Sequence, residues 1–121
     1  MIIISKILIA LVAIEHLYIL YIEMFAWETK GKATFRSIPP ELFKPTKILA
    51  ANQGLYNGFL SAGLVWALLI ENGLWAKNIA LFFLSCVIIA AIYGAATASK
   101  SIFFKQGLPA IIALIFVLLT P

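Results

Sequence analysis

The sequence contains no aspartate, a single cysteine and a single histidine. One cysteine, Cys86, cannot form an internal disulfide, and we interpret it as a packing residue, since buried cysteine behaves as a small apolar group. The chain also has no spaced Cys, His and acidic cluster of the kind that holds a metal, no nucleotide-binding glycine loop and no Ser–His–Asp set. We therefore expect neither a metal nor another cofactor, and an enzymatic activity is disfavoured.

Charged residues are also scarce, at 12%, whereas 64% of the residues are hydrophobic. Soluble domains contain about 45–50% apolar and about 25% charged residues. A soluble fold of 121 residues could not bury so much apolar side chain, so the expected surroundings are a lipid bilayer. The net charge of +4 does not indicate nucleic acid, because most Lys and Arg residues lie in loops beside apolar runs.

The chain has four apolar segments, of which the first three have the length of about 20 helical residues that crossing a membrane takes, whereas the fourth is short. The first lacks the basic start and the cleavage site of a signal peptide, so we interpret it as a span. Trp27 and Trp75 are expected at the membrane interface. The sequence therefore predicts an all-α membrane protein, a four-transmembrane-helix bundle in a single domain (1–121). The predicted spans are residues 2–27, 48–70, 76–98 and 107–120.

The distribution of Lys and Arg predicts how the chain is oriented. All nine except Lys6 and Lys77 lie in the loops of residues 28–47 and 99–106. Because cytoplasmic loops carry an excess of positive charge, we expect these two loops in the cytoplasm and both termini outside. Phe35 and Phe43 of the longer loop are expected to lie on the membrane surface.

The first span carries Glu15 and His16 near its middle and Glu23 near its end. A charged residue at the centre of a bilayer costs about 2.5–3.5 kcal/mol or more, so by default it marks a functional site. On an α-helix these three residues share one half, which should face other helices or a water-filled cavity. Two alternatives remain open: Glu15 and His16 form a purely structural pair, and Glu23 is an ordinary interfacial charge.

The second and third spans carry polar side chains at the depth of Glu23. We expect one cavity that opens to the cytoplasm, with Glu15 and His16 as its floor and these residues around its mouth. The alternative is that the amides and phenols only join the helices to one another. The residues expected at the mouth are Glu23, Asn52, Gln53, Tyr56, Asn57 and Tyr93.

Small residues accompany these polar faces. Gly54 and Gly58 form a G-x-x-x-G step, and Gly94 belongs to a similar stripe in the third span. Such positions let another helix approach closely, either within one chain or from a second copy. We therefore expect helix packing at these glycines and a homodimer.

Two blocks of the sequence carry a resemblance to a known family. Glu15-His16-Leu17-Tyr18-x-x-Tyr21-x-Glu23-Met24-Phe25-x-Trp27, followed by Asn52-Gln53-Gly54-x-Tyr56-Asn57-Gly58, resembles bacterial domain-of-unknown-function family 1304. The resemblance covers nearly the whole chain. It implies an integral, multi-pass protein of the bacterial inner (plasma) membrane and supplies no activity.

Three functional hypotheses follow. The first is a homodimer that binds or transports a small molecule or ion, with Glu15 as proton or cation site and His16 as its partner. The second is an accessory membrane subunit whose polar face binds a partner protein. The third is an intramembrane enzyme acting on a lipid-like substrate, in which His16 and a glutamate move protons.

Overall fold

Four main helices account for most of the chain in the computed structural model, which describes all 121 residues. The all-α prediction is confirmed. Each helix lies within a few residues of a segment expected from hydropathy. The main helices are α1 (Ile3–Phe25), α3 (Lys47–Leu69), α4 (Gly73–Thr97) and α5 (Leu108–Leu118).

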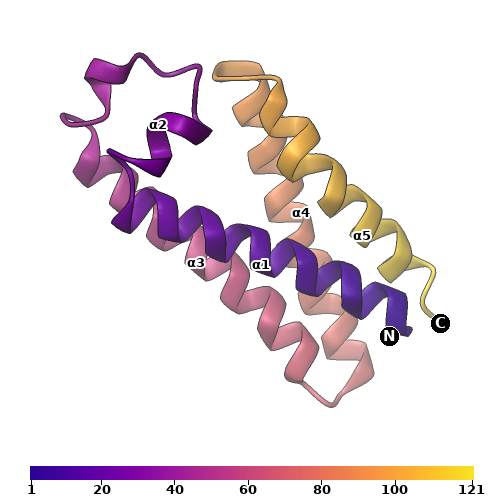
Figure 1. Cartoon of the computed structure of the whole chain (residues 1–121). Helices are drawn as coiled ribbons and strands as arrows, with labels where there is room; N and C mark the ends of the chain where they lie inside the picture. Colours follow the sequence, from indigo (N-terminus) through magenta and orange to yellow (C-terminus); the bar gives the residue numbers. More distant parts are fainter.

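The helices run up and down in sequence order, and the connections at their two ends differ in length (Figure 1). A tight turn joins α3 to α4 at the end that also holds both termini. At the opposite end, the first connection contains α2 (Lys30–Thr34) and the 3-10 turn η1 (Pro40–Leu42). There the π-helical turn η2 (Phe103–Gly107) also leads directly into α5. We call these the terminal end and the loop end of the bundle.

The terminal end is closed by a tightly packed apolar core. Its fully buried residues come from all four main helices, so no helix there is loosely attached. Hydrogen bonds add to the closure: Ser5 Oγ lies 3.2 Å from Thr120 Oγ1, and Lys77 Nζ donates to the Thr120 carbonyl at 2.7 Å. The core residues are Ile9, Val12, Ala13, Leu64, Ala67, Ile79, Ala80, Leu84, Val87, Ala110, Ala113 and Val117.

Helices α1 and α3 pack closely along most of their length. At Gly54, an added Cβ would lie 2.7 Å from Met24 Cγ and 3.0 Å from Glu23 Cβ. At Gly58 it would lie 2.6 Å from Leu20 Cδ1. The G-x-x-x-G step therefore faces α1 of the same chain and is not free for a second copy. Gly94 of α4 lies against Ile102, where an added Cβ would be 3.2 Å from Cγ2.

The first connection has a small aromatic core of its own. The Trp27 ring lies 4.8 Å from the Phe43 ring and 5.4 Å from the Phe35 ring, centroid to centroid. Trp27 Nε1 also donates to Thr46 Oγ1 at 3.0 Å. Trp27 is only 8% exposed and Phe43 is fully buried, so both rings pack inside the chain, and their expected place at the membrane interface stays a prediction. The loop folds back on the end of α1 and covers both rings.

Two of the helices, α1 and α4, are long and apolar enough to cross a membrane. Helix α3 has the length, but it carries Asn52, Gln53 and Asn57 and does not meet the same measure. The apolar helix formed by η2 and α5 (Phe103–Leu118) is shorter. The two long apolar helices suggest a membrane location.

Candidate ligand-binding site

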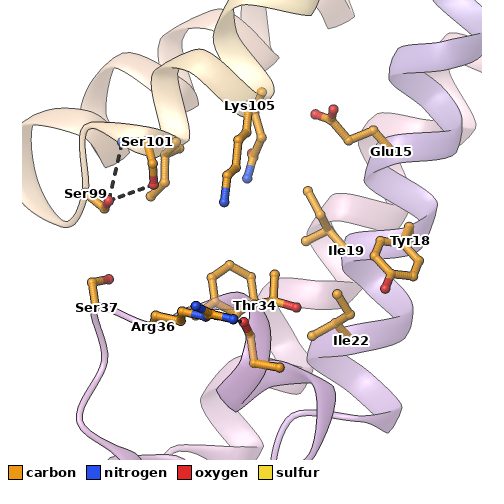
Figure 2. A pocket seen from close by; sticks show the side chains of 14 residues that line it. Glu15, Tyr18, Ile19, Ile22, Thr34, Arg36, Ser37, Ser99, Ser101 and Lys105 are labelled. Carbon is orange, nitrogen blue, oxygen red and sulfur yellow. Dashed lines mark hydrogen bonds between the residues drawn. The ribbon is translucent and has the colours of Figure 1, made fainter.

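The bundle is hollowed at the loop end, where a cavity of about 780 Å³ lies beside α1. One wall is α1, and the other walls are α2 with the residues after it and the connection from α4 to α5 (Figure 2). We call this the first cavity. It is lined by Glu15, Tyr18, Ile19, Ile22, Ala33, Thr34, Phe35, Arg36, Ser37, Ser99, Ser101, Ile102, Lys105 and Gln106.

Glu15 is the acidic residue of the first cavity. Its Oε1 atom is buried and has no hydrogen-bond partner within the chain. A buried acceptor without a partner costs about 1–3 kcal/mol, and more when it is charged. Glu15 shares its helix face with Tyr18, Ile19 and Ile22, so the carboxylate sits at one end of a partly apolar wall. The site can therefore accept a hydrogen bond from a ligand.

Two basic residues line the walls of the first cavity that lie across from α1. Arg36 follows α2, and Lys105 belongs to the π-helical turn η2. The Arg36 Nε donates to the Ala33 carbonyl at 3.2 Å, which holds the guanidinium beside the cavity. Ser99 and Ser101 lie in the same connection as Lys105, with their hydroxyl oxygens 2.8 Å apart (Figure 2). This side offers cationic and hydroxyl donors.

A second cavity, of about 660 Å³, adjoins the first between α1, α3 and α4. Ile19, Phe35, Ile102 and Gln106 line both cavities, so the two form adjoining lobes. The second cavity has an apolar part beside Phe59, Leu60, Cys86 and Ala90 of α3 and α4. Its polar lining residues are Glu23, Gln53, Tyr56, Asn57, Tyr93, Thr97 and Gln106.

Glu23 differs from Glu15 because both oxygens of its carboxylate accept hydrogen bonds. Gln53 Nε2 donates to Glu23 Oε2 at 2.7 Å, and Asn57 Nδ2 donates to Oε1 at 2.5 Å. Gln53 and Asn57 are four residues apart and so lie on one face of α3, opposite Glu23. Glu23 is 2% exposed. This pair of bonds joins α1 to α3 and fixes the wall of the second cavity.

The structure separates residues that the sequence analysis placed around one cavity. His16 is 1% exposed, its Nδ1 lies 2.9 Å from the Val12 carbonyl oxygen, and it lines neither cavity. Asn52 is exposed and donates to the carbonyl of Ile48 at 2.9 Å. The single cavity with a Glu15–His16 floor is therefore replaced by two lobes. Adjacent helical residues point about 100° apart, so Glu15 and His16 face different neighbours.

The basic and hydroxyl side of the first cavity was missed by sequence reasoning. Arg36 and Lys105 were used only to predict orientation, because a loop has no periodicity that assigns a direction to its side chains. The proximity of two loops rich in Lys, Arg and Ser at one end of a bundle was the available signal. No group of three His, Cys, Asp or Glu side chains is placed to hold a metal ion.

Residues 10–118 match a family model described as "Protein of unknown function (DUF1304)". The chain belongs to this family. A relative from Lactococcus lactis subsp. lactis (strain IL1403), "Uncharacterized protein YpaA", is 36% identical over 117 residues, which is 95% of this chain and 97% of the relative. No solved structure matches the chain. Every residue that lines the two cavities falls within the range matched to the DUF1304 family.

Proposed function

We propose that this DUF1304 protein is an integral protein of the bacterial inner membrane that binds a small polar or amphipathic molecule in the first cavity. One observation carries the proposal: Glu15, whose buried Oε1 has no hydrogen-bond partner within the chain, lines a cavity large enough for a ligand. Small-molecule sites have volumes of about 300–1,000 Å³ and combine apolar walls with a few polar groups. The first cavity has both properties, with Arg36 and Lys105 as further polar groups.

The proposed orientation places the loop end in the cytoplasm. Residues 28–47 and 99–106 lie together at that end, and they contain all Lys and Arg residues except Lys6 and Lys77. Positive charge on one side of a membrane protein favours the cytoplasmic side. In this orientation the four main helices cross the bilayer, both termini are outside, and a ligand enters from the cytoplasmic side.

Transport is the extension of this proposal. The chain is hollow at the loop end and packed at the terminal end, so a ligand that enters from the loop end meets the apolar core. Passage through the membrane requires that core to open, or a second copy to complete a pathway. We propose a homodimer whose contact uses the exposed apolar faces of the helices. Gly54 and Gly58 are not available for this contact, because they pack against α1 of the same chain.

Native mass spectrometry of the protein released from a mild detergent tests the binding proposal. We expect the wild type to carry a bound small molecule and Glu15→Gln to lose it. Glu41→Gln is the matched control, because it removes an exposed carboxylate at the same end of the bundle without altering either cavity. Thermal unfolding of the three proteins shows whether loss of ligand reflects loss of fold.

The outcomes separate the competing functions. A bare wild-type protein that is unchanged by Glu15→Gln would reject ligand binding and favour an accessory subunit. Proton coupling is read in vesicles: uptake of the identified ligand should respond to a pH gradient in the wild type and fail in Glu15→Gln. Uptake that is the same in both proteins would reject Glu15 as the coupling residue.

A further inference from the structure

The charges around the first cavity are of opposite sign on opposite walls. Glu15 lies on α1, whereas Arg36 and Lys105 project from the two loop-end connections (Figure 2). These are the acidic and basic residues that line the cavity. Resting on the proposed function, we propose that the ligand is a zwitterion with a primary amine and a phosphate, the chemistry of an ethanolamine phospholipid headgroup.

The two cations, which come from two neighbouring walls, fit the phosphate. Arg36 presents a planar guanidinium, whose geometry matches phosphate oxygens, and Lys105 adds a mobile point charge. The Nε of Arg36 is already used by the Ala33 carbonyl, so its terminal nitrogens are left for a ligand. Ser37, Ser99 and Ser101 lie on the same side and add hydroxyl donors. Hydroxyl, guanidinium and ammonium groups together suit an anion with several oxygens.

The Glu15 side fits an amine better than a metal ion. Divalent cations such as calcium or magnesium take six or more oxygen ligands, and this wall offers one carboxylate. A primary ammonium has three N–H donors and can donate to the Glu15 carboxylate, which has an oxygen without a partner in the chain. A trimethylammonium group has no N–H donor, so it would leave that oxygen without a hydrogen bond.

The second cavity provides room for an apolar chain attached to this headgroup. Ile19, Phe35 and Ile102 line both lobes, so the two lobes adjoin at apolar side chains that an acyl chain could displace. The second cavity continues between α3 and α4 beside Phe59, Leu60, Cys86 and Ala90. A headgroup in the first cavity would therefore have its glycerol and the start of an acyl chain beside these side chains.

Lipid titrations of the delipidated full-length protein in mild detergent, followed by native mass spectrometry, test the inference. The probes are phosphatidylethanolamine, phosphatidylcholine and phosphatidylglycerol with identical acyl chains. We expect the wild type to bind the ethanolamine lipid about tenfold or more tightly than the other two, since only its headgroup donates N–H hydrogen bonds to a carboxylate. Free phosphoethanolamine is added as a competitor. Strong competition identifies a soluble ligand of the same chemistry, and weak competition identifies the lipid.

Variants test which charged residue recognises which part of the headgroup. Glu15→Gln should abolish the discrimination between ethanolamine and choline lipids, while Arg36→Gln and Lys105→Gln should weaken the binding of all three lipids. Lys100→Gln is the matched control, because Lys100 precedes Ser101 in the same connection and lines neither cavity. Equal binding of ethanolamine and choline lipids by the wild type would overturn the inference.

The inference and the proposed function fail in different ways. If a different molecule co-purifies with the wild type and is lost from Glu15→Gln, binding in the first cavity stands and the zwitterion assignment is wrong. If the wild type carries no molecule and binds no probe, both are wrong. Circular dichroism of each variant at the titration temperature shows that a weakened response comes from a folded protein.

Discussion

The contact between α1 and α3 makes a specific prediction about Gly54. The substitution Gly54→Ala adds a Cβ that would lie 3.0 Å from Glu23 Cβ and 3.3 Å from the Leu20 carbonyl oxygen. These atoms belong to or adjoin the backbone of α1, so they cannot move unless the two helices separate. Separation would also lengthen the bonds from Gln53 and Asn57 to Glu23.

The size of the effect follows from opposing contributions. Overpacking typically costs about 1–3 kcal/mol. Each weakened bond between membrane helices adds about 0.5–2 kcal/mol. Alanine regains up to about 1 kcal/mol of helix propensity. We expect a net loss of about 1–3 kcal/mol in the free energy of unfolding.

Two other glycines serve as controls. At Gly58 the new Cβ meets Leu20 Cδ1, the far end of a flexible side chain, so Gly58→Ala should change the unfolding free energy by less than about 1 kcal/mol. At Gly73 nothing lies within 4 Å, and Gly73→Ala should be neutral. The assay is unfolding in mixed micelles with increasing denaturing detergent, followed by circular dichroism. A Gly54→Ala protein as stable as Gly58→Ala would refute the close packing of α1 on α3.

Four further predictions follow from the same structure. A double-mutant cycle of Glu23→Ala and Asn57→Ala should give a coupling energy of about 0.5–2 kcal/mol in the micelle assay, and additive effects would contradict the direct bond. Trp27→Phe and Thr46→Val should each lower stability by about 1 kcal/mol, and the double variant should lose less than their sum, because the two residues share one hydrogen bond. Ser61→Ala should lose about 0.5–1.5 kcal/mol, since Ser61 Oγ donates to the Ala13 carbonyl at 2.8 Å, whereas exposed Ser101→Ala should change stability little. Lys44→Cys in a Cys86→Ser background should react with a membrane-impermeant maleimide in inverted vesicles and not in intact cells; the reverse result would invert the proposed orientation.

Hydropathy and length were enough to predict the all-α fold, because an apolar segment of this length has few options except a helix. They also placed Glu23, Gln53 and Asn57 at one depth, and the structure brings these three into hydrogen-bond contact. Depth along a helix follows from the rise per residue, which the sequence supplies directly. The membrane crossings of all four main helices remain predictions, supported for α1 and α4 by their length and apolar composition.

Direction around a helix was less predictable than depth. The polar face expected on α3 is about 140° wide, and only the edge with Gln53 and Asn57 turns toward α1. Asn52, on the other edge, bonds back to its own helix. Which edge is used depends on the position of α1, and that position is set by the bare surface of Gly54 and Gly58. The burial of Trp27 under the first connection was not predictable for a similar reason, because a loop that folds over a ring leaves no periodic signal.

The π-helical turn η2 determines whether Lys105 lies in the wall of the first cavity. A π turn is equivalent to an α-helix with one extra residue inserted, and such turns occur often at functional sites. Deleting Gln106, which follows Lys105 in this turn, would restore α-helical geometry and rotate the preceding residues by about 100° relative to α5. Lys105 would then leave the cavity wall while α5 kept its packing. Relatives with and without this one residue would thus share a fold and differ in whether the cavity carries its second cation.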